Sequence, residues 1–250
     1  MLFLTANQIQ YTMKYIIPKN TTDFSGKKVL YSLMVLLACV VLSSCHNTTT
    51  AQTLADQPNA IDLGLSVLWA DRNIGADSPT AYGDYFAWGE IKPKDRYSWS
   101  SYKYCNDGDY HKLTKYCAKN NYGNVVNKEI LDPEDDAAVQ NLGNGWRMPT
   151  IEEYKEFLDN CDWKWTTKDG VNGSEFTSKK NGNKIFFPAA GLKGQIFSNT
   201  DSYGNFWSSS LYSDDPSNAQ GLYFDSGNAD LIDWYGRCNG FPVRAVRSKN

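Results

Sequence analysis

The sequence predicts an α+β domain, and three observations support this fold class. Glycine and aromatic residues are frequent, with 19 glycines and 14% aromatic side chains among 250 residues. Helix-type patterning is confined to two short stretches between residues 132 and 161. Short apolar segments separated by glycine-containing turns fill much of the remaining sequence from residue 59 onwards. We therefore expect two short helices packed on a twisted, largely antiparallel sheet with long loops.

The first 44 residues are predicted to be a lipoprotein signal peptide. Two lysines, Lys27 and Lys28, precede an almost uninterrupted apolar run over residues 29–42, which is shorter than the ~20 residues that span a bilayer. The run ends in Leu-Ser-Ser-Cys, which resembles the bacterial lipobox at all four positions. The resemblance implies that Cys45 becomes lipidated and is the first residue of the mature protein. Met1 and Met13 are both possible start residues.

Residues 45–58 are polar and aperiodic, so we interpret them as a flexible tether. The lipid would make the membrane a partner and would hold the protein in the cell envelope, with the outer membrane as the expected location. Acidic residues just after the cysteine resemble a surface-export signal in Bacteroidota-type lipoproteins, and none lies between Cys45 and Ala55. Periplasmic and surface orientations therefore both stay open.

The domain proper is assigned to residues 59–250. Near-alternating apolar residues over 61–70 predict a first strand or hairpin, and 82–90 form a second aromatic segment. Residues 92–128 are rich in tyrosine and poor in aliphatic side chains, which favours a long loop region. The formal net charge is −3 with no basic patch, so a nucleic-acid partner is not expected.

Two helices have clear end signals. In the first, Asp132 is the expected N-cap, followed by Pro133 and two acids, and Gly143 is the expected end. In the second, Thr150 and Glu153 form a capping box before a continuous apolar face. That face comprises Ile151, Tyr154, Phe157, Leu158 and Cys161. Further short strands are expected at residues 184–188, 206–208, 221–224 and 242–246.

Six segments, in order along the chain, carry a family resemblance that covers about residues 60–247. The segments are Asp62–Leu65 with Trp69-Ala70, Tyr82–Glu90, Gly145–Glu153, Phe187–Gly191, Gly204–Ser210 and Val243-Arg244-x-Val246. Together they resemble the Fibrobacter succinogenes major paralogous domain. That family is similar to the C-type-lectin-like fold, which formylglycine-generating enzymes also use. The resemblance thus implies this fold, but one fold hosts many functions.

One of these segments is expected to play a structural role. Its members are Trp146, Arg147, Pro149, Thr150 and Glu153, and formylglycine-generating enzymes have a similar Arg-x-Pro-Thr-x-x-Glu sequence. We expect Arg147 to pair with an acid in the first helical turn and to fix the strand-to-helix connection.

The residues that usually perform catalysis are scarce, so we expect a protein that is not an enzyme and has no cofactor. The two histidines, His46 and His111, fall in the tether and the tyrosine-rich loop. An enzyme related to formylglycine-generating enzymes is the weakest hypothesis, because Cys238 has no second cysteine near it in sequence. No metal site is predicted. The sequence contains the acidic pairs Asp135-Asp136 and Asp214-Asp215 but none of the tripeptides by which calcium-dependent lectins bind the ion. Calcium binding at an acidic pair stays an alternative.

A ligand surface of exposed aromatic rings is the main functional hypothesis, because aromatic rings stack on the apolar faces of sugars. Loops also carry binding surfaces, so large aromatic side chains exposed on loops favour a binding role. The ligand would be a glycan or an envelope protein. The alternative is a structural or assembly component of the envelope without a small ligand. The candidate ligand-binding residues are Tyr97, Trp99, Tyr102, Tyr104, Tyr110, Tyr212, Trp234 and Tyr235.

Four cysteines remain after removal of the signal peptide and lipidation of Cys45. Outside the cytoplasm they permit two disulfides. We favour a bond between Cys105 and Cys117, which would close a short loop. Cys161 is equally suited to be a buried thiol or a partner of Cys238.

Overall fold

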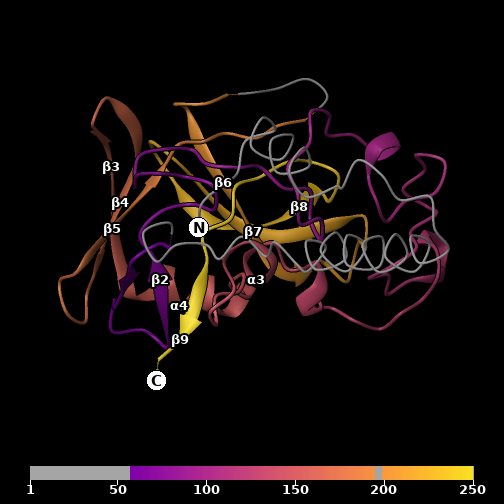
Figure 1. Ribbon diagram of the computed structural model, residues 1–250, viewed down its shortest axis with the longest axis horizontal. Helices are drawn as coiled ribbons and strands as arrows, with labels where there is room; N and C mark the ends of the chain where they lie inside the picture. The colour runs from indigo at the N-terminus through magenta and orange to yellow at the C-terminus, as the bar shows by residue number, and fades with distance from the viewer. Residues whose placement is uncertain (1–56, 195–198, 250) are drawn as a thin grey trace, which may run out of the picture. The chain divides into compact units, whose positions relative to one another are not determined.

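The computed structural model describes residues 57–194 and 199–249, which belong to one compact unit that runs from Gln52 to Asn250. The described part contains two α-helices and three small antiparallel sheets (Figure 1). The α+β class is therefore confirmed, whereas three separate sheets replace the single one expected. The predicted signal peptide, Cys45 and most of the tether lie outside the described residues. Among the described helices, none is long and apolar enough to cross a membrane.

The first sheet joins the two ends of the domain. Strand β2 (Val67–Ala70) lies between β1 (Ala60–Ile61) and β9 (Val246–Ser248). The hairpin expected over residues 61–70 is confirmed. The strand expected at 242–246 is only partly right, because β9 begins at the last of these residues. The preceding residues still pair with the start of the domain, since the carbonyls of Val243 and Ala245 accept backbone hydrogen bonds.

The second sheet contains a hairpin that sequence patterning missed. Its strand order is β3 (Cys161–Lys168), β4 (Val171–Ser178) and β5 (Lys184–Pro188), and the three labels lie together at the left of Figure 1. The strand expected at 184–188 is confirmed. Cys161 is the first residue of β3 rather than part of the helical face, because the helix passes into the strand without a loop.

The third sheet has the order β6 (Tyr203–Leu211), β7 (Asn218–Asp225) and β8 (Ala229–Gly236). Strands β6 and β7 contain the segments expected at 206–208 and 221–224. The run of three serines in β6 lies at a register shift between Trp207 and Leu211. There Ser208 donates a hydrogen bond to the carbonyl of Gln220, and Ser210 accepts one from the amide of Ile151. The first bond serves a carbonyl at the register shift, and the second serves an amide at the N-terminus of α4 that has no partner within the helix.

The two predicted helices are present as α3 (Ala137–Leu142) and α4 (Ile151–Asn160). For α3 the expected N-cap was wrong: Asp136, not Asp132, accepts hydrogen bonds from the amides of Ala138 and Val139. The segment Pro133–Asp135 forms a separate 3₁₀ turn, η4, before the helix starts. The end of α3 at Gly143 and the capping box of α4 are confirmed.

The expected role of Arg147 agrees with the geometry. Its two terminal nitrogens donate to the two carboxylate oxygens of Glu153 at 2.7 and 2.5 Å, and one also reaches the carbonyl of Met148. Glu153 in turn accepts from the amide of Thr150 at 2.9 Å. A bidentate pair of this kind fixes both direction and distance, so it holds the turn into α4. Trp146 and Pro149 are buried beside it.

Tryptophan, phenylalanine and tyrosine build most of the core. Trp69, Trp88, Trp146 and Trp207 are all buried, as expected for a domain short of aliphatic residues. One cluster surrounds Trp69 under β2 and α4, and another surrounds Trp88 and Trp207. The tyrosine-rich loops between residues 92 and 128 pack at the end of the domain opposite β3–β5 (Figure 1). They contain the 3₁₀ turns η2 (Trp99–Ser101) and η3 (Asn120–Tyr122).

Candidate functional site

Three of the expected ligand-binding tyrosines are buried, which corrects the sequence interpretation of this loop. Tyr97, Tyr102 and Tyr104 pack in a third core cluster. The hydroxyl of Tyr97 donates to the carbonyl of Tyr85 at 2.5 Å, and that of Tyr102 donates to the carbonyl of Trp88 at 2.7 Å. The hydroxyl of Tyr104 donates to the carboxylate of Asp135. A tyrosine combines an apolar ring with a polar tip, so it can fill a core whose backbone groups need partners. These three side chains do not form a ligand surface.

Other aromatic side chains of the same loops do reach the surface. Tyr110 is 41% exposed, and its ring centroid lies 5.9 Å from that of Trp99 and 6.4 Å from that of Tyr122. The exposed imidazole of His111 lies between the rings of Tyr110 and Tyr122, at 4.0 and 5.5 Å. Four rings from three loop segments therefore form one continuous group at the end of the domain.

A β-bulge places a fifth ring on the surface. Ala219 pairs with Tyr235 and Gly221 with Ile232, so the single residue Gln220 of β7 lies opposite two residues of β8. Those two residues, Asp233 and Trp234, are both exposed, whereas Ile232 is buried. Without the bulge, alternation along the strand would turn one of the two towards the core. Trp234 is 67% exposed, the largest exposed fraction among the large hydrophobic side chains that the structure describes.

Tyr235 and Tyr212 have different positions in this region. Tyr235 packs against the core, with its ring in an edge contact 5.1 Å from that of Phe241, and it is partly buried. Tyr212 lies at the end of β6 and is half-buried. Its nearest charged neighbours are acids, and the charge of Asp233 is the main reason that its pKa is raised.

Contacts link the loop rings to the β6–β7 turn and to β8. A side chain at Gly236 would touch the indole of Trp99 at 3.3 Å, so Trp99 lies directly on β8. Burial and the neighbouring Asp215 carboxylate raise the pKa of Tyr122, which places η3 beside the β6–β7 turn. We call the resulting region the aromatic surface. It consists of Trp99, Tyr110, His111, Tyr122, Tyr212, Asp215, Asp233 and Trp234.

The aromatic surface is bordered by more acids than bases. Lys112 pairs with Asp107 at 3.0 Å, and Lys119 lies 3.8 Å from Asp214. Among the described residues, three further acids of this region have no lysine or arginine partner within 4.0 Å: Asp109, Asp215 and Asp233. Asp109 instead contacts the ring of His111 at 3.3 Å. The surface therefore combines apolar ring faces with carboxylates that can accept hydrogen bonds.

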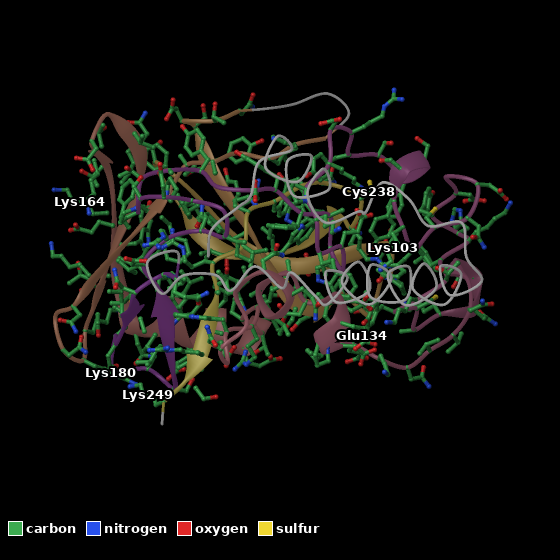
Figure 2. The ribbon with its side chains drawn as sticks, viewed as in Figure 1. Lys103, Glu134, Lys164, Lys180, Cys238 and Lys249 are labelled. Carbon is green, nitrogen blue, oxygen red and sulfur yellow. The ribbon has the colours of Figure 1, made fainter. Side chains whose placement is uncertain are left out.

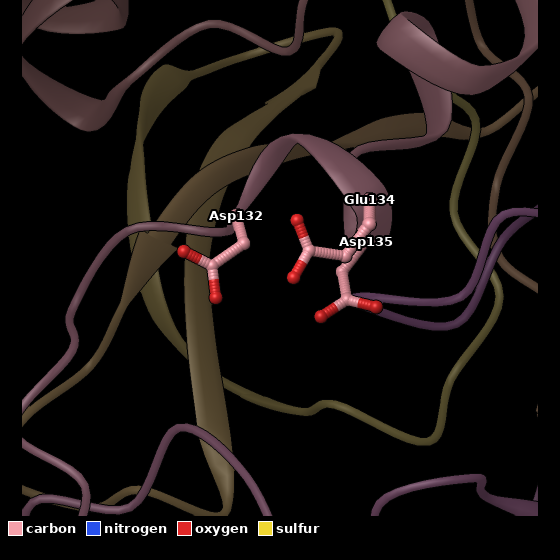
Figure 3. Close-up of side chains that lie close together, drawn as sticks. All are labelled: Asp132, Glu134 and Asp135. Atoms are coloured by element: carbon pink, nitrogen blue, oxygen red, sulfur yellow. The ribbon is translucent and has the colours of Figure 1, made fainter.

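A second group of acids lies nearby but is already paired. Asp132, Glu134 and Asp135 bring carboxylate oxygens within 4.8 Å of one another (Figure 3). The ammonium group of Lys115 lies among them, 3.6 Å from Asp132 and 3.6 Å from Glu134, and it contacts Asp135 most closely. A lysine thus holds the position that a cation would take. Burial alone would lower the pKa of Lys115, but hydrogen bonds and charge interactions with Asp135 and Tyr116 raise it, so Lys115 stays charged.

The predicted bond between Cys105 and Cys117 is absent from the described residues. The four described cysteines are free thiols, and the Sγ atoms of these two donate instead to the carbonyls of Asp109 and Lys119. Both thiols are tied to their own local turns. Cys238 packs in the same tyrosine cluster as Cys117 and lies toward the loop end of the domain, whereas Lys164 lies at the opposite end (Figure 2).

Two cavities lined by described residues lie elsewhere. The larger has a volume of about 420 Å³ and is lined by residues that include Arg72, Asp77, Asp84 and Asn141. The smaller, about 260 Å³, lies beside Leu68 and Arg247. Neither of these two cavities includes a residue of the aromatic surface, where Tyr110 and Trp234 expose their ring faces.

Of the eight candidate ligand-binding residues, the structure brings Trp99, Tyr110, Tyr212 and Trp234 together on one surface. Sequence reasoning missed His111, Tyr122, Asp215 and Asp233 as neighbours of these rings. Only the bulge and the packing of η3 on the β6–β7 turn reveal them, and no sequence motif marks either feature. Comparisons with protein-family models, with curated proteins and with solved structures find no match to this chain.

Proposed function

We propose that this chain is a lipid-anchored protein of the cell envelope whose domain binds a glycan without chemical turnover. The observation that carries the proposal is the exposed indole of Trp234, which lies in the aromatic surface. A soluble domain gains nothing in stability from a bulge that turns a tryptophan to solvent. Exposure of the indole is explained if its face stacks on the apolar face of a ligand.

Sugars suit this surface for two reasons. The axial C–H groups of a pyranose form a flat apolar face that stacks on an aromatic ring. Its hydroxyl groups need acceptors, and the carboxylates of Asp215 and Asp233 adjoin the rings. An open platform also fits an extended chain of sugars better than a single small molecule, which would need a pocket to bury most of its surface.

The proposed anchor is the lipid on Cys45, and the outer membrane is the proposed location. The support for both is the sequence Leu42-Ser43-Ser44-Cys45 after a short apolar run. A diacylglyceryl group supplies two chains, enough for stable attachment. The polar residues that follow would let the domain reach ligands away from the bilayer.

We also propose that the domain has a C-type-lectin-like fold of the Fibrobacter succinogenes major paralogous type. The support is the order of its six motifs and the α+β architecture, in which side chains of these motifs hydrogen-bond segments that are far apart in the chain. Arg147 pairs with Glu153, and Arg244 donates to Asn73 and to the carbonyls of Ala70 and Phe186. Such hydrogen bonds stabilise a scaffold whose loops can vary.

A binding role without catalysis fits the chemistry of the acids. Lys115 contacts the carboxylates of Asp132, Glu134 and Asp135. The thiol of Cys238 is buried, and that burial raises its pKa to about 12. A poised nucleophile or general base needs the opposite, an accessible group with a pKa near the working pH.

A glycan array tests the proposal. The full chain, purified in non-ionic detergent, should bind a subset of glycans, and Trp234→Ala should weaken binding by about tenfold or more through the lost ring contact. Trp163→Ala is the matched control, since Trp163 is a half-buried tryptophan of β3 at the opposite end. A blank array at high protein concentration, or equal losses in the two variants, would overturn the proposal and leave a structural role in the envelope.

A further inference from the structure

The charges around the aromatic surface select among sugars. Asp233 adjoins Trp234 in the bulge of β8, and both side chains face solvent. Asp214 and Asp215 lie in the β6–β7 turn, close enough to act with Asp233 on the hydroxyl of Tyr212. Asp214 is 83% exposed. Three carboxylates therefore surround one edge of the ring platform.

The bases that face the same region do not cancel this charge. Lys119 contacts both the carbonyl and the carboxylate of Asp214, so it offsets the charge of only one of the three acids. Lys112 is engaged by Asp107 at 3.0 Å. His111 faces Asp109. The described residues leave Asp215 and Asp233 without a basic partner within 4.0 Å, so the platform has a negative local potential.

We infer that the preferred ligand is a glycan that carries free amino groups, such as an oligomer of glucosamine, rather than a neutral or acidic glycan. This inference rests on the proposed glycan-binding function. A protonated amine on a sugar ring stacked on Trp234 can reach the neighbouring carboxylate of Asp233. The same ammonium interacts favourably with ring faces of the platform, because aromatic faces attract cations. A neutral hydroxyl at that position gains neither interaction, and an acidic sugar is repelled by the three aspartates.

Three oligosaccharides of matched length and linkage isolate the amine. They are β-1,4-linked oligomers of glucosamine, N-acetylglucosamine and glucose, which differ only in the substituent at C2. Binding to the full chain in non-ionic detergent is measured by calorimetry at about pH 6, below the ~7.7–8.0 typical of an α-amino group. The glucosamine oligomer should bind roughly tenfold more tightly than the other two, as one exposed ion pair combined with one cation–π contact would give.

The variant Asp233→Asn should remove most of this preference, because the amide keeps an oxygen that accepts hydrogen bonds from sugar hydroxyls but carries no charge. Asp169→Asn is the matched control, because Asp169 is an exposed acid in the β3–β4 turn at the opposite end of the domain. Added salt should weaken the glucosamine oligomer selectively, since the pair is exposed.

The outcomes separate the inference from the function on which it rests. Equal binding of the three oligomers would overturn the charge preference while glycan binding stands. Binding of none of them, together with a blank array, would overturn both. Binding of an oligolysine peptide as tight as that of the glucosamine oligomer would also overturn the inference, because the surface would then recognise charge without a sugar ring.

Discussion

Arg237 donates its Nε–H to the hydroxyl of Tyr102 at 3.0 Å, and both side chains are buried. The other guanidinium nitrogens donate to the carbonyls of Tyr116 at 2.6 Å and Lys115 at 3.0 Å. The cation also lies over the ring of Trp88, 5.1 Å from its centroid. Within the described residues no carboxylate lies within 4.0 Å of it. Carbonyl dipoles and ring faces balance its charge and join the end of β8 to the tyrosine-rich loops.

Replacing Arg237 by methionine should therefore destabilise the domain strongly. The variant keeps an unbranched stem but leaves two carbonyls and a buried hydroxyl without their donor, at a cost of about 2–4 kcal/mol. Urea unfolding at neutral pH measures the loss. Arg96→Met is the control, because Arg96 is an exposed arginine of the same loop region. If the two variants lose equal stability, the buried arginine does not hold these segments together.

Acid should weaken the fold partly through Asp135. Burial alone would raise the pKa of this carboxyl, but hydrogen bonds from Lys115, Tyr104 and Tyr116 outweigh burial and hold it below its usual value. A depressed pKa in the folded state stabilises the protein above the unfolded-state pKa of about 3.9 and loses that effect as pH falls through the folded value. Asp135→Asn should thus cost about 1–3 kcal/mol at neutral pH and progressively less below about pH 4.

The comparison is made by chemical denaturation at a series of pH values. Asp169→Asn again provides the control, since an exposed acid without an ion pair should show no such dependence. A difference between wild type and Asp135→Asn that stays constant down to acid pH would contradict the assigned role of the carboxylate.

Much of the local structure was predictable because short-range chemistry dictates it. The capping box of Thr150 and Glu153 needs only residues three apart, and the strand at 184–188 is an apolar run with a clear start. The Arg147–Glu153 pair follows from the same local geometry. Burial of the four named tryptophans follows from composition, since few aliphatic residues were available to fill the core.

The site was predictable only in part, because long-range packing decides it. The sequence could not distinguish Tyr102, whose hydroxyl finds a carbonyl in the core, from Tyr110, which faces solvent. The exposure of both Asp233 and Trp234 depends on a bulge set by pairing with β7. Asp136 rather than Asp132 caps α3 because Pro133–Asp135 forms the separate turn η4, so the helix begins only at Ala137.

The thiols should react in an order set by burial. Cys105 is half-exposed, whereas burial raises the pKa of Cys161 to about 11 and that of Cys238 to about 12. The thiolate is the reactive form, so in the folded protein a maleimide should modify Cys105 first and the other thiols only after unfolding. Peptide mapping under non-reducing conditions gives the result. Recovery of a peptide in which Cys105 is joined to Cys117 would contradict the arrangement of the loop.

Attachment to the membrane should depend on Cys45 alone among the cysteines of the N-terminal segment. Cys45→Ser should move the cleaved protein, which has lost the apolar run, from the detergent phase to the aqueous phase on Triton X-114 partition, whereas uncleaved protein keeps that run and stays in the detergent phase. Cys39→Ser is the matched control, since Cys39 lies in the apolar run that would be removed. Detergent partition of the cleaved protein that is the same for both variants would rule out the lipid anchor.

Contact between a sugar and the indole of Trp234 is the central claim, and saturation-transfer NMR tests it most directly. The full chain in non-ionic detergent is mixed with soluble oligomers of glucose, N-acetylglucosamine, galactose and glucosamine, and protein aromatic protons are irradiated. The account predicts saturation of axial ring protons of at least one sugar in the wild type and its loss in Trp234→Ala, with Trp163→Ala unchanged. Equal saturation in Trp234→Ala and wild type would contradict it.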